Sequence, residues 1–130
     1  MRLLLDTCAV IFANQEPERL SGNVRAIISD PTSQIFVSAV THAEIACAVA
    51  KQRLTLPMPW EHFLPTVARQ FHWHILPVTL ECFEGAYELP GDFHKDPCDR
   101  IIVATARLHG FTLVTTDGLI LDYPHVKSMS

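Results

Sequence analysis

Hydrophobic residues along the chain gather into short runs that alternate with longer stretches of mixed character. Brief apolar runs stand at 3–5, 35–38, 75–78 and 111–117, as expected for strands that are buried on both faces. The stretches between them repeat apolar residues three and four positions apart, which predicts helices. We expect these helices at 17–30, 41–52, 60–71, 79–89 and 97–109.

Proline, glycine and hydroxyl residues mark where these elements start and stop. Thr79 is expected to cap the helix at 79–89, and Gly110 suits the position just after the helix at 97–109. Pro31 ends the first predicted helix, whereas Pro65 lies inside the third and predicts a break or a late start there. The tail from residue 125 onward allows one more edge strand.

The regular alternation of strand and helix predicts an α/β fold. We expect one domain over residues 1–130, with a parallel sheet of four to five strands and helices on both faces. In open parallel sheets, ligands bind beyond the carboxyl ends of the strands. Residues that directly follow the predicted strands are therefore the first candidates for function.

Composition and charge narrow the class of protein. Hydrophobic residues make up 48% of the chain, which excludes a disordered protein. The net charge of −4 argues against a protein that grips nucleic acid mainly through phosphates. It leaves room for an enzyme with a local basic rim, for which Lys51, Arg53 and Lys95 are candidates.

Cysteine spacing indicates the redox environment. Cys8, Cys47, Cys82 and Cys98 form no CxxC pair, and each lies in an apolar stretch. We interpret them as reduced, packed thiols of a cytoplasmic protein. No apolar run approaches the length of a transmembrane helix, so no membrane association is expected.

Acidic residues fall where the predicted strands end. Asp6 and Asp117 directly follow the first and fourth strands, and Glu44 lies in the first turn of the helix after the second. Asp99 lies in the first turn of the helix that precedes the fourth strand. Right-handed crossovers return parallel strands in the same direction, so these acids are expected to share one edge of the sheet.

Each acid also has a purely structural interpretation. Glu44 would complete a capping box with Thr41, Asp6 would cap the helix that follows it, and Asp117-Gly118 is a turn signal. Asp99 would be an N3 acid in a helix capped by Asp96. Each structural reading is sufficient for its own residue.

Considered together, the acids favour a metal site. Carboxylates that converge on one rim repel one another, and a divalent cation removes that repulsion. Oxygen ligands with no nearby histidine or cysteine favour Mg²⁺ or Mn²⁺ over zinc. Such a site suggests phosphoryl chemistry. The chain has no glycine-rich phosphate loop and no recognisable Ser-His-Asp or Cys-His arrangement.

Four successive segments resemble the motifs of a PIN domain, with VapC-like toxins as the nearest likeness. The segments, in chain order, are LLLDTCAVIF, SAVTHAEIACAVAKQRL, HKDPCDRIIVATARLHG and LVTTDGLIL. The resemblance implies a metal-dependent endoribonuclease that cleaves RNA as the toxin of a toxin–antitoxin pair. It also implies a small antitoxin as partner and a homodimer.

The resemblance assigns roles to individual residues. Its four catalytic, metal-binding acids match Asp6, Glu44, Asp99 and Asp117, whereas Asp96 matches an element that looks structural. The residues that it suggests near the substrate are Thr7, Thr115 and Thr116, and we add Arg100, which could contact RNA or pair with a surface acid. One departure stands out, because many relatives carry a further acid where this chain has Ile120.

Two other functions are compatible with a small domain of this kind. A PIN-fold protein without catalysis could serve as a binding module. A response-regulator-like phosphoacceptor domain is the other alternative, but it needs an acceptor aspartate after the third strand and a lysine near the last. The segments ILPVTL and LVTTDG offer neither.

Overall fold

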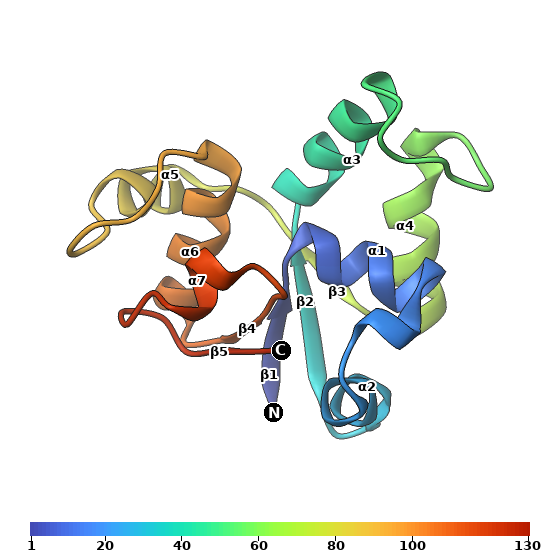
Figure 1. Ribbon diagram of the computed structural model, residues 1–130, viewed down its shortest axis with the longest axis horizontal. Helices are drawn as coiled ribbons and strands as arrows, with labels where there is room; N and C mark the ends of the chain where they lie inside the picture. The colour runs from blue at the N-terminus through green and yellow to red at the C-terminus, as the bar shows by residue number, and fades with distance from the viewer.

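Five parallel strands form the central sheet of the computed structural model, which describes residues 1–130 (Figure 1). The strand order is β3-β2-β1-β4-β5, and β1 pairs with both β2 and β4. The predicted parallel sheet of four to five strands is therefore confirmed. The strands are β1 (Arg2–Leu5), β2 (Gln34–Ser38), β3 (His74–Leu76), β4 (Thr112–Val114) and β5 (Ser128–Met129).

Helices cover both faces of this sheet, as the sequence predicts (Figure 1). The first group packs on one face and the second on the other, and α3 rises from the end of β2. The first group comprises α1 (Thr7–Gln15), the 3-10 helix η1 (Pro17–Arg19), α2 (Gly22–Ser29), α3 (Val40–Ala50) and α4 (Trp60–Phe71). The second group comprises α5 (Leu80–Tyr87), α6 (Pro97–His109) and α7 (Gly118–Leu121).

Alternation along β1 explains how one strand supplies both cores. Leu3 and Leu5 face α1, α2 and α4, whereas Leu4 faces α6 and α7, and all three are fully buried. Successive side chains of a strand point to opposite faces of its sheet, so a central strand needs apolar residues throughout. This requirement accounts for the unbroken LLL run.

The parallel strands place their carboxyl ends along one rim. The Asp6 backbone N–H donates to the Val114 carbonyl at 3.1 Å, and the Ala39 N–H donates to the Leu76 carbonyl at 2.8 Å. The amino-terminal ends of α1, α3 and α6 lie at this rim (Figure 1). Side chains just beyond the strands therefore meet residues from the first turns of helices.

Several predicted helix ends are confirmed. Thr79 caps α5 by accepting from the Cys82 N–H at 3.2 Å, and Gly110 ends α6 with a φ of 69°. The helix expected at 17–30 starts later than predicted, at Gly22. Pro17 instead opens the 3-10 helix η1, and the Ser21 hydroxyl caps α2 by accepting from Val24.

The predicted break at Pro65 is wrong. Helix α4 runs without interruption from Trp60 to Phe71 and holds Pro65 in its interior. Its apolar face is buried in the core, while Pro65 itself is exposed. We attribute the continuity to this packing, which offsets the missing backbone hydrogen bond, and the Glu61 carbonyl that Pro65 leaves free lies on the exposed side.

The expectation of packed thiols is only partly confirmed. All four cysteines are free and Cys82 is buried, but Cys8 and Cys47 are exposed. Cys8 lies in the first turn of α1 and Cys47 lies on α3, so both belong to helices that begin at the rim and leave part of their surface uncovered. None of the helices combines the length and apolar character needed to cross a bilayer.

Candidate active site

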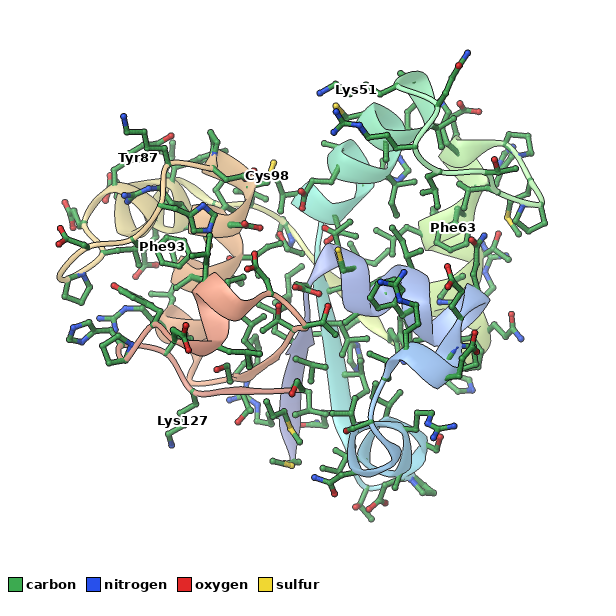
Figure 2. The ribbon with its side chains drawn as sticks, in the orientation of Figure 1. Lys51, Phe63, Tyr87, Phe93, Cys98 and Lys127 are labelled. Atoms are coloured by element: carbon green, nitrogen blue, oxygen red, sulfur yellow. The ribbon has the colours of Figure 1, made fainter.

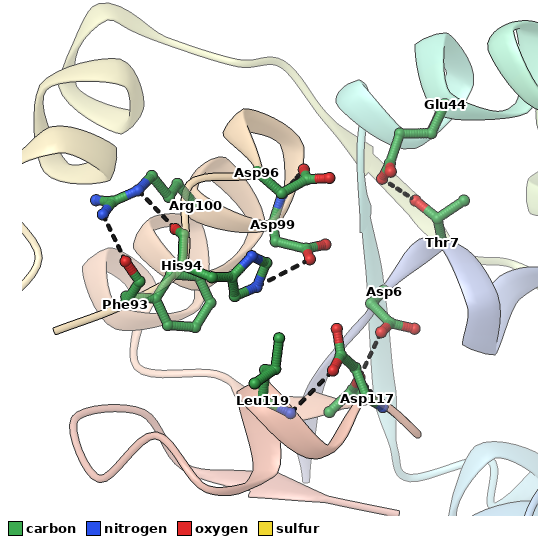
Figure 3. Close-up of polar contacts among 11 residues, drawn as sticks. Asp6, Thr7, Glu44, Phe93, His94, Asp96, Asp99, Arg100, Asp117 and Leu119 are labelled. Carbon is green, nitrogen blue, oxygen red and sulfur yellow. Dashed lines mark hydrogen bonds and ion pairs between the residues drawn. The ribbon is translucent and has the colours of Figure 1, made fainter.

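Acidic side chains from four different segments gather at the carboxyl ends of the strands (Figure 3). Asp6 follows β1, Glu44 extends from α3, Asp99 lies in the first turn of α6, and Asp117 follows β4. The arrangement expected from the strand ends is therefore present. The contacts of each acid decide what it can do.

Asp6 is both a helix cap and a buried acid. Its Oδ1 accepts from the Ala9 N–H at 2.8 Å, and its Oδ2 accepts from the Thr115 hydroxyl at 2.5 Å. Burial raises the pKa of Asp6 to about 6, and the charges of Asp99 and Asp117 add to this rise, although both hydrogen bonds oppose it. The two interpretations of Asp6 are therefore compatible.

Thr115 is fully buried beneath the acids. It donates to Asp6, and its hydroxyl also accepts from the Asp117 N–H at 3.0 Å. These two contacts fix the position of Asp6 relative to the loop after β4. Thr116, by contrast, is exposed.

The capping box expected for Glu44 is absent. Helix α3 begins at Val40, and its N-cap is Ala39, which makes no side-chain hydrogen bond. Thr41 is buried inside the first turn, and its hydroxyl lies 3.0 Å from that of Thr7. Glu44 therefore does not serve as a capping residue of α3.

Thr7 holds Glu44 in place. The Thr7 hydroxyl donates to Glu44 Oε1 at 2.5 Å, so Thr7 orients Glu44. Burial raises the pKa of Glu44, and Asp96 and Asp6 add to the rise, while the Thr7 hydrogen bond opposes it. Glu44 is thus a half-buried carboxylate at the rim that is held by Thr7 and pairs with no cationic side chain.

Asp96 and Asp99, which lie at the start of α6, have different roles. Asp96 Oδ1 accepts from the Asp99 N–H at 3.0 Å, which confirms Asp96 as the helix cap. The Asp99 side chain instead points toward the other acids (Figure 3). Burial raises the pKa of Asp99 to about 6, with further contributions from Asp96 and Glu44 and an opposing one from His94.

Asp117 opens the short helix α7. Its Oδ1 accepts from the Leu119 N–H at 2.9 Å, so the turn signal in the sequence is a helix cap. Ile120, at the position where relatives often carry an acid, is fully buried in the core with Leu4. That position therefore packs against the sheet, and Asp117 is the acid that this loop contributes.

Arg100 points away from the acids (Figure 3). Its guanidinium donates to the carbonyls of His94 at 2.9 Å, Phe93 at 2.8 Å and Ala86 at 2.9 Å. It pairs with no surface acid, and backbone acceptors already occupy three of its nitrogens. We therefore leave Arg100 out of the proposed RNA contacts.

His94 is the member of the site that sequence reasoning missed. Its Nε2 lies 3.2 Å from Asp99 Oδ2, and the ligand atoms of His94, Asp99 and Asp117 all lie within 4.8 Å of one another. The expectation that no histidine stands near the acids is therefore wrong. The available signal was its place in HKDPCDR, five residues before Asp99, where a loop can fold back over the helix start.

A second group joins the two sides of the rim. Ligand atoms of Glu44, Asp96 and Cys98 also lie within 4.8 Å of one another. Partial burial, followed by the charges of Glu44 and Asp96, raises the pKa of the Cys98 thiol to about 11. Cys98 is consequently a neutral thiol at neutral pH, and carboxylates supply the charge of this group.

The donor set suits a hard divalent cation. Carboxylate oxygens dominate both groups, and no lysine or arginine side chain pairs with any of these acids. Burial first, and the neighbouring carboxylates second, raise the pKa values of Asp6, Glu44 and Asp99, so their charged forms would gain from a bound cation. Oxygen-rich sites of this kind bind Mg²⁺ or Mn²⁺, and one histidine does not change that preference.

The fold and this rim define an α/β domain with a carboxylate site at the strand ends, and comparison with known proteins places it in a family. The PIN domain family model matches residues 3–125, so the chain belongs to the PIN domain family. Ribonuclease VapC22 of Mycobacterium tuberculosis is 30% identical over 128 residues, which cover 98% of this chain and 96% of that protein.

Several solved structures have a similar fold, among them a toxin–antitoxin complex from Klebsiella pneumoniae, with a TM-score of 0.67 and 21% identity over 98% of this chain and 96% of the other. DNA-bound VapBC from Salmonella typhimurium matches with a TM-score of 0.71 and 18% identity, covering 99% of this chain and 97% of the other. FitAcB from Neisseria gonorrhoeae matches with a TM-score of 0.63 and 25% identity, covering 98% of this chain and 96% of the other. The predicted PIN fold is thus confirmed over essentially the whole chain.

Proposed function

We propose that this chain is a metal-dependent endoribonuclease that acts as the toxin of a toxin–antitoxin pair. The observation that carries the proposal is that Asp6, Glu44, Asp99 and Asp117 come from separate elements to one rim (Figure 3), where Asp99 and Asp117 are close enough to share an ion and no lysine or arginine pairs with any of the four. The similarity to a protein named as a VapC ribonuclease supports RNA as the substrate. The carboxylates that would hold Mg²⁺ or Mn²⁺ are these four acids.

The ion would lower the pKa of a bound water and neutralise negative charge on the RNA phosphate at the cleavage site. The chain's own residues prepare the site for it. Thr115 and the Ala9 N–H hold Asp6, and Thr7 holds Glu44. Preorganised ligands of this kind reduce the rearrangement that binding would otherwise require.

The hydroxyls of Thr7 and Thr115 were expected to lie near the substrate. Their contacts indicate that they hold the acids in place and do not touch the substrate, because Thr115 is fully buried and the Thr7 hydroxyl is engaged by Glu44 and Thr41. Lys51, Arg53 and Lys95 are exposed, and we propose them as contacts for the RNA backbone. Lys51 lies at the far tip of α3 (Figure 2).

We further propose a small antitoxin as partner, a homodimer as the assembly, and the cytoplasm as the location. The similarity to VapBC and FitAcB complexes supports the antitoxin. The free cysteines agree with a reducing compartment. A PIN-fold binding module without catalysis is the alternative, and the complete set of acids disfavours it.

The decisive experiment compares two neighbouring aspartates. Asp99→Asn removes a charge from the acid cluster, and we expect RNA cleavage in Mn²⁺ to fall by several orders of magnitude while the melting temperature in EDTA falls no lower than that of wild type. Asp96→Asn is the comparison variant: Asp96 lies beside Glu44 and Cys98, but its Oδ1 is engaged as the helix cap, and asparagine caps helices equally well, so we expect cleavage to be largely retained. Cleavage that survives Asp99→Asn, or that persists in EDTA, would contradict the proposal and favour the binding module.

A further inference from the structure

The imidazole of His94 lies against the acid cluster and has a buried ring nitrogen that makes no hydrogen bond. Its Nε2 is buried and has no hydrogen-bond partner within the protein. The nearest acceptor is Asp99 Oδ2 at 3.2 Å, and the two side chains are 24% and 21% exposed. Buried polar atoms are normally hydrogen-bonded, because an unpartnered one costs stability. A nitrogen kept in this state needs an explanation.

Contacts of the loop before α6 fix the position of the His94 ring. Arg100 donates to the His94 and Phe93 carbonyls, and its third contact, with Ala86, ties this loop to α5. The Phe93 ring packs on the His94 ring, with centroids 4.4 Å apart, and on Tyr123, with centroids 4.8 Å apart. The loop before α6 is therefore anchored to the same helix that carries Asp99 (Figure 3).

Asp99 lacks the support that the other acids receive. Side-chain hydroxyls donate to Asp6 and Glu44, and the Leu119 N–H donates to Asp117. The Asp99 backbone N–H is engaged by Asp96, but no group donates a hydrogen bond to its carboxylate, and His94 is the one side chain in ion-pair contact with it. Groups that contact metal ligands in this way set the orientation of those ligands and raise metal affinity.

We propose that His94 is a positioning residue, which holds the Asp99 carboxylate in the orientation that binds a divalent cation, and that Arg100 fixes the loop that presents it. This inference rests on the proposed function of the same site. Nε2 faces Asp99 and is buried, so the geometry favours a contact with the carboxylate over direct ligation of an ion.

The test measures Mn²⁺ binding by titration calorimetry, with melting curves in EDTA to verify folding. His94→Phe keeps a ring but removes the nitrogen, and we expect its Mn²⁺ Kd to rise by about tenfold or more. His94→Gln places an amide nitrogen near the position of Nε2, so we expect it to bind nearly as wild type does. His62→Phe, on the exposed side of α4, is the matched control and should bind unchanged.

A second pair of variants covers the case in which His94→Phe does not fold. The amide of His94→Asn reaches only as far as Nδ1, so this variant should lose Mn²⁺ affinity where His94→Gln retains it. Cleavage by His94→Asn should recover as Mn²⁺ is raised, because the defect lies in metal binding. A general structural defect would not respond to the ion in this way.

The outcomes separate this inference from the proposed function. Wild-type affinity in folded His94→Phe or His94→Asn would overturn the positioning role while leaving the nuclease intact. Equal losses in the glutamine and asparagine variants would also overturn it, because the reach of the nitrogen would then be irrelevant. Wild-type protein that neither binds Mn²⁺ nor cleaves RNA would overturn both proposals.

Discussion

The Asp6 carboxylate combines two requirements that usually fall on different residues. One oxygen caps α1 and the other accepts from buried Thr115, so the group is anchored from two sides. Its burial nevertheless disfavours the charged form, as the raised pKa records. At the residue scale, the site therefore consists of acids whose positions are stabilised although their charges are not.

This conflict predicts how the stability of the metal-free protein depends on pH. The pKa of Asp6 is about 6 in the folded protein, against 3.8 ordinarily. Between these values the folded state holds a proton that the unfolded chain has released, so stability should fall as pH rises from about 4 to about 6. The effect at neutral pH corresponds to about 3 kcal/mol at most.

Asp6→Asn should remove this contribution. We expect the variant to melt at a higher temperature than wild type in EDTA at pH 7, because asparagine still caps α1 but carries no buried charge. The difference should shrink toward pH 4, where Asp6 is protonated in the folded protein. Asp122→Asn is the control at an exposed position of the same chain. An equal difference between Asp6→Asn and wild type at both pH values would show that Asp6 carries no such strain.

At the scale of elements, the loop before α6 depends on one side chain. Arg100 satisfies three backbone carbonyls with a planar fork of donors, which lysine cannot reproduce. Arg100→Lys should therefore lower the free energy of unfolding by about 2 kcal/mol or more. Urea denaturation measures the change, and Arg69→Lys, exposed on α4, should be close to neutral.

Helix α4 offers the opposite kind of prediction. Pro65 interrupts its hydrogen-bond ladder while the buried face holds the helix together. Pro65→Ala should restore one backbone hydrogen bond and stabilise the protein by about 1 kcal/mol, after allowance for the greater freedom of the unfolded chain. Pro57→Ala, in the exposed loop before α4, should not stabilise. A loss of stability in Pro65→Ala would mean that the proline geometry suits this helix.

At the scale of the whole molecule, the acids join parts of the fold that pack on opposite faces of the sheet. Glu44 belongs to α3 on one side of the rim, and Asp99 belongs to α6 on the other (Figure 3). A cation bound between them would stabilise the folded state by mass action. Under the proposed function, metal binding would therefore be coupled to folding of the entire domain.

Melting curves with EDTA and with excess Mn²⁺ test this coupling. At an Mn²⁺ concentration of about 100 times Kd, we expect wild type to gain roughly 2.7 kcal/mol. Glu44→Gln should gain less, because it withdraws a charge from the site, yet it should melt no lower than wild type in EDTA. Glu61→Gln, exposed on α4, is the control. If Mn²⁺ stabilised Glu44→Gln as much as it stabilises wild type, Glu44 would not be a metal ligand.

The pattern of residues along the chain is enough to predict the sheet, the helices on both of its faces and the rim on which the acids meet. The LLL run requires a strand buried on both faces, and the crossovers of parallel strands then place Asp6 and Asp117 at one edge. Asp96 was also predictable as a cap, since its partner lies three residues away. These features depend on local pattern and on chain connectivity.

The groups that touch those acids, by contrast, depend on how distant segments pack in three dimensions. Thr7 reaches Glu44 across 37 residues, and Thr115 reaches Asp6 across 109. His94 and Arg100 are close to Asp99 in sequence, but the loop before α6 turns His94 toward the carboxylate, whereas Arg100, on α6 itself, points away from it (Figure 3). Such choices follow from how packed elements present their side chains, and the spacing of residues along the chain does not specify this.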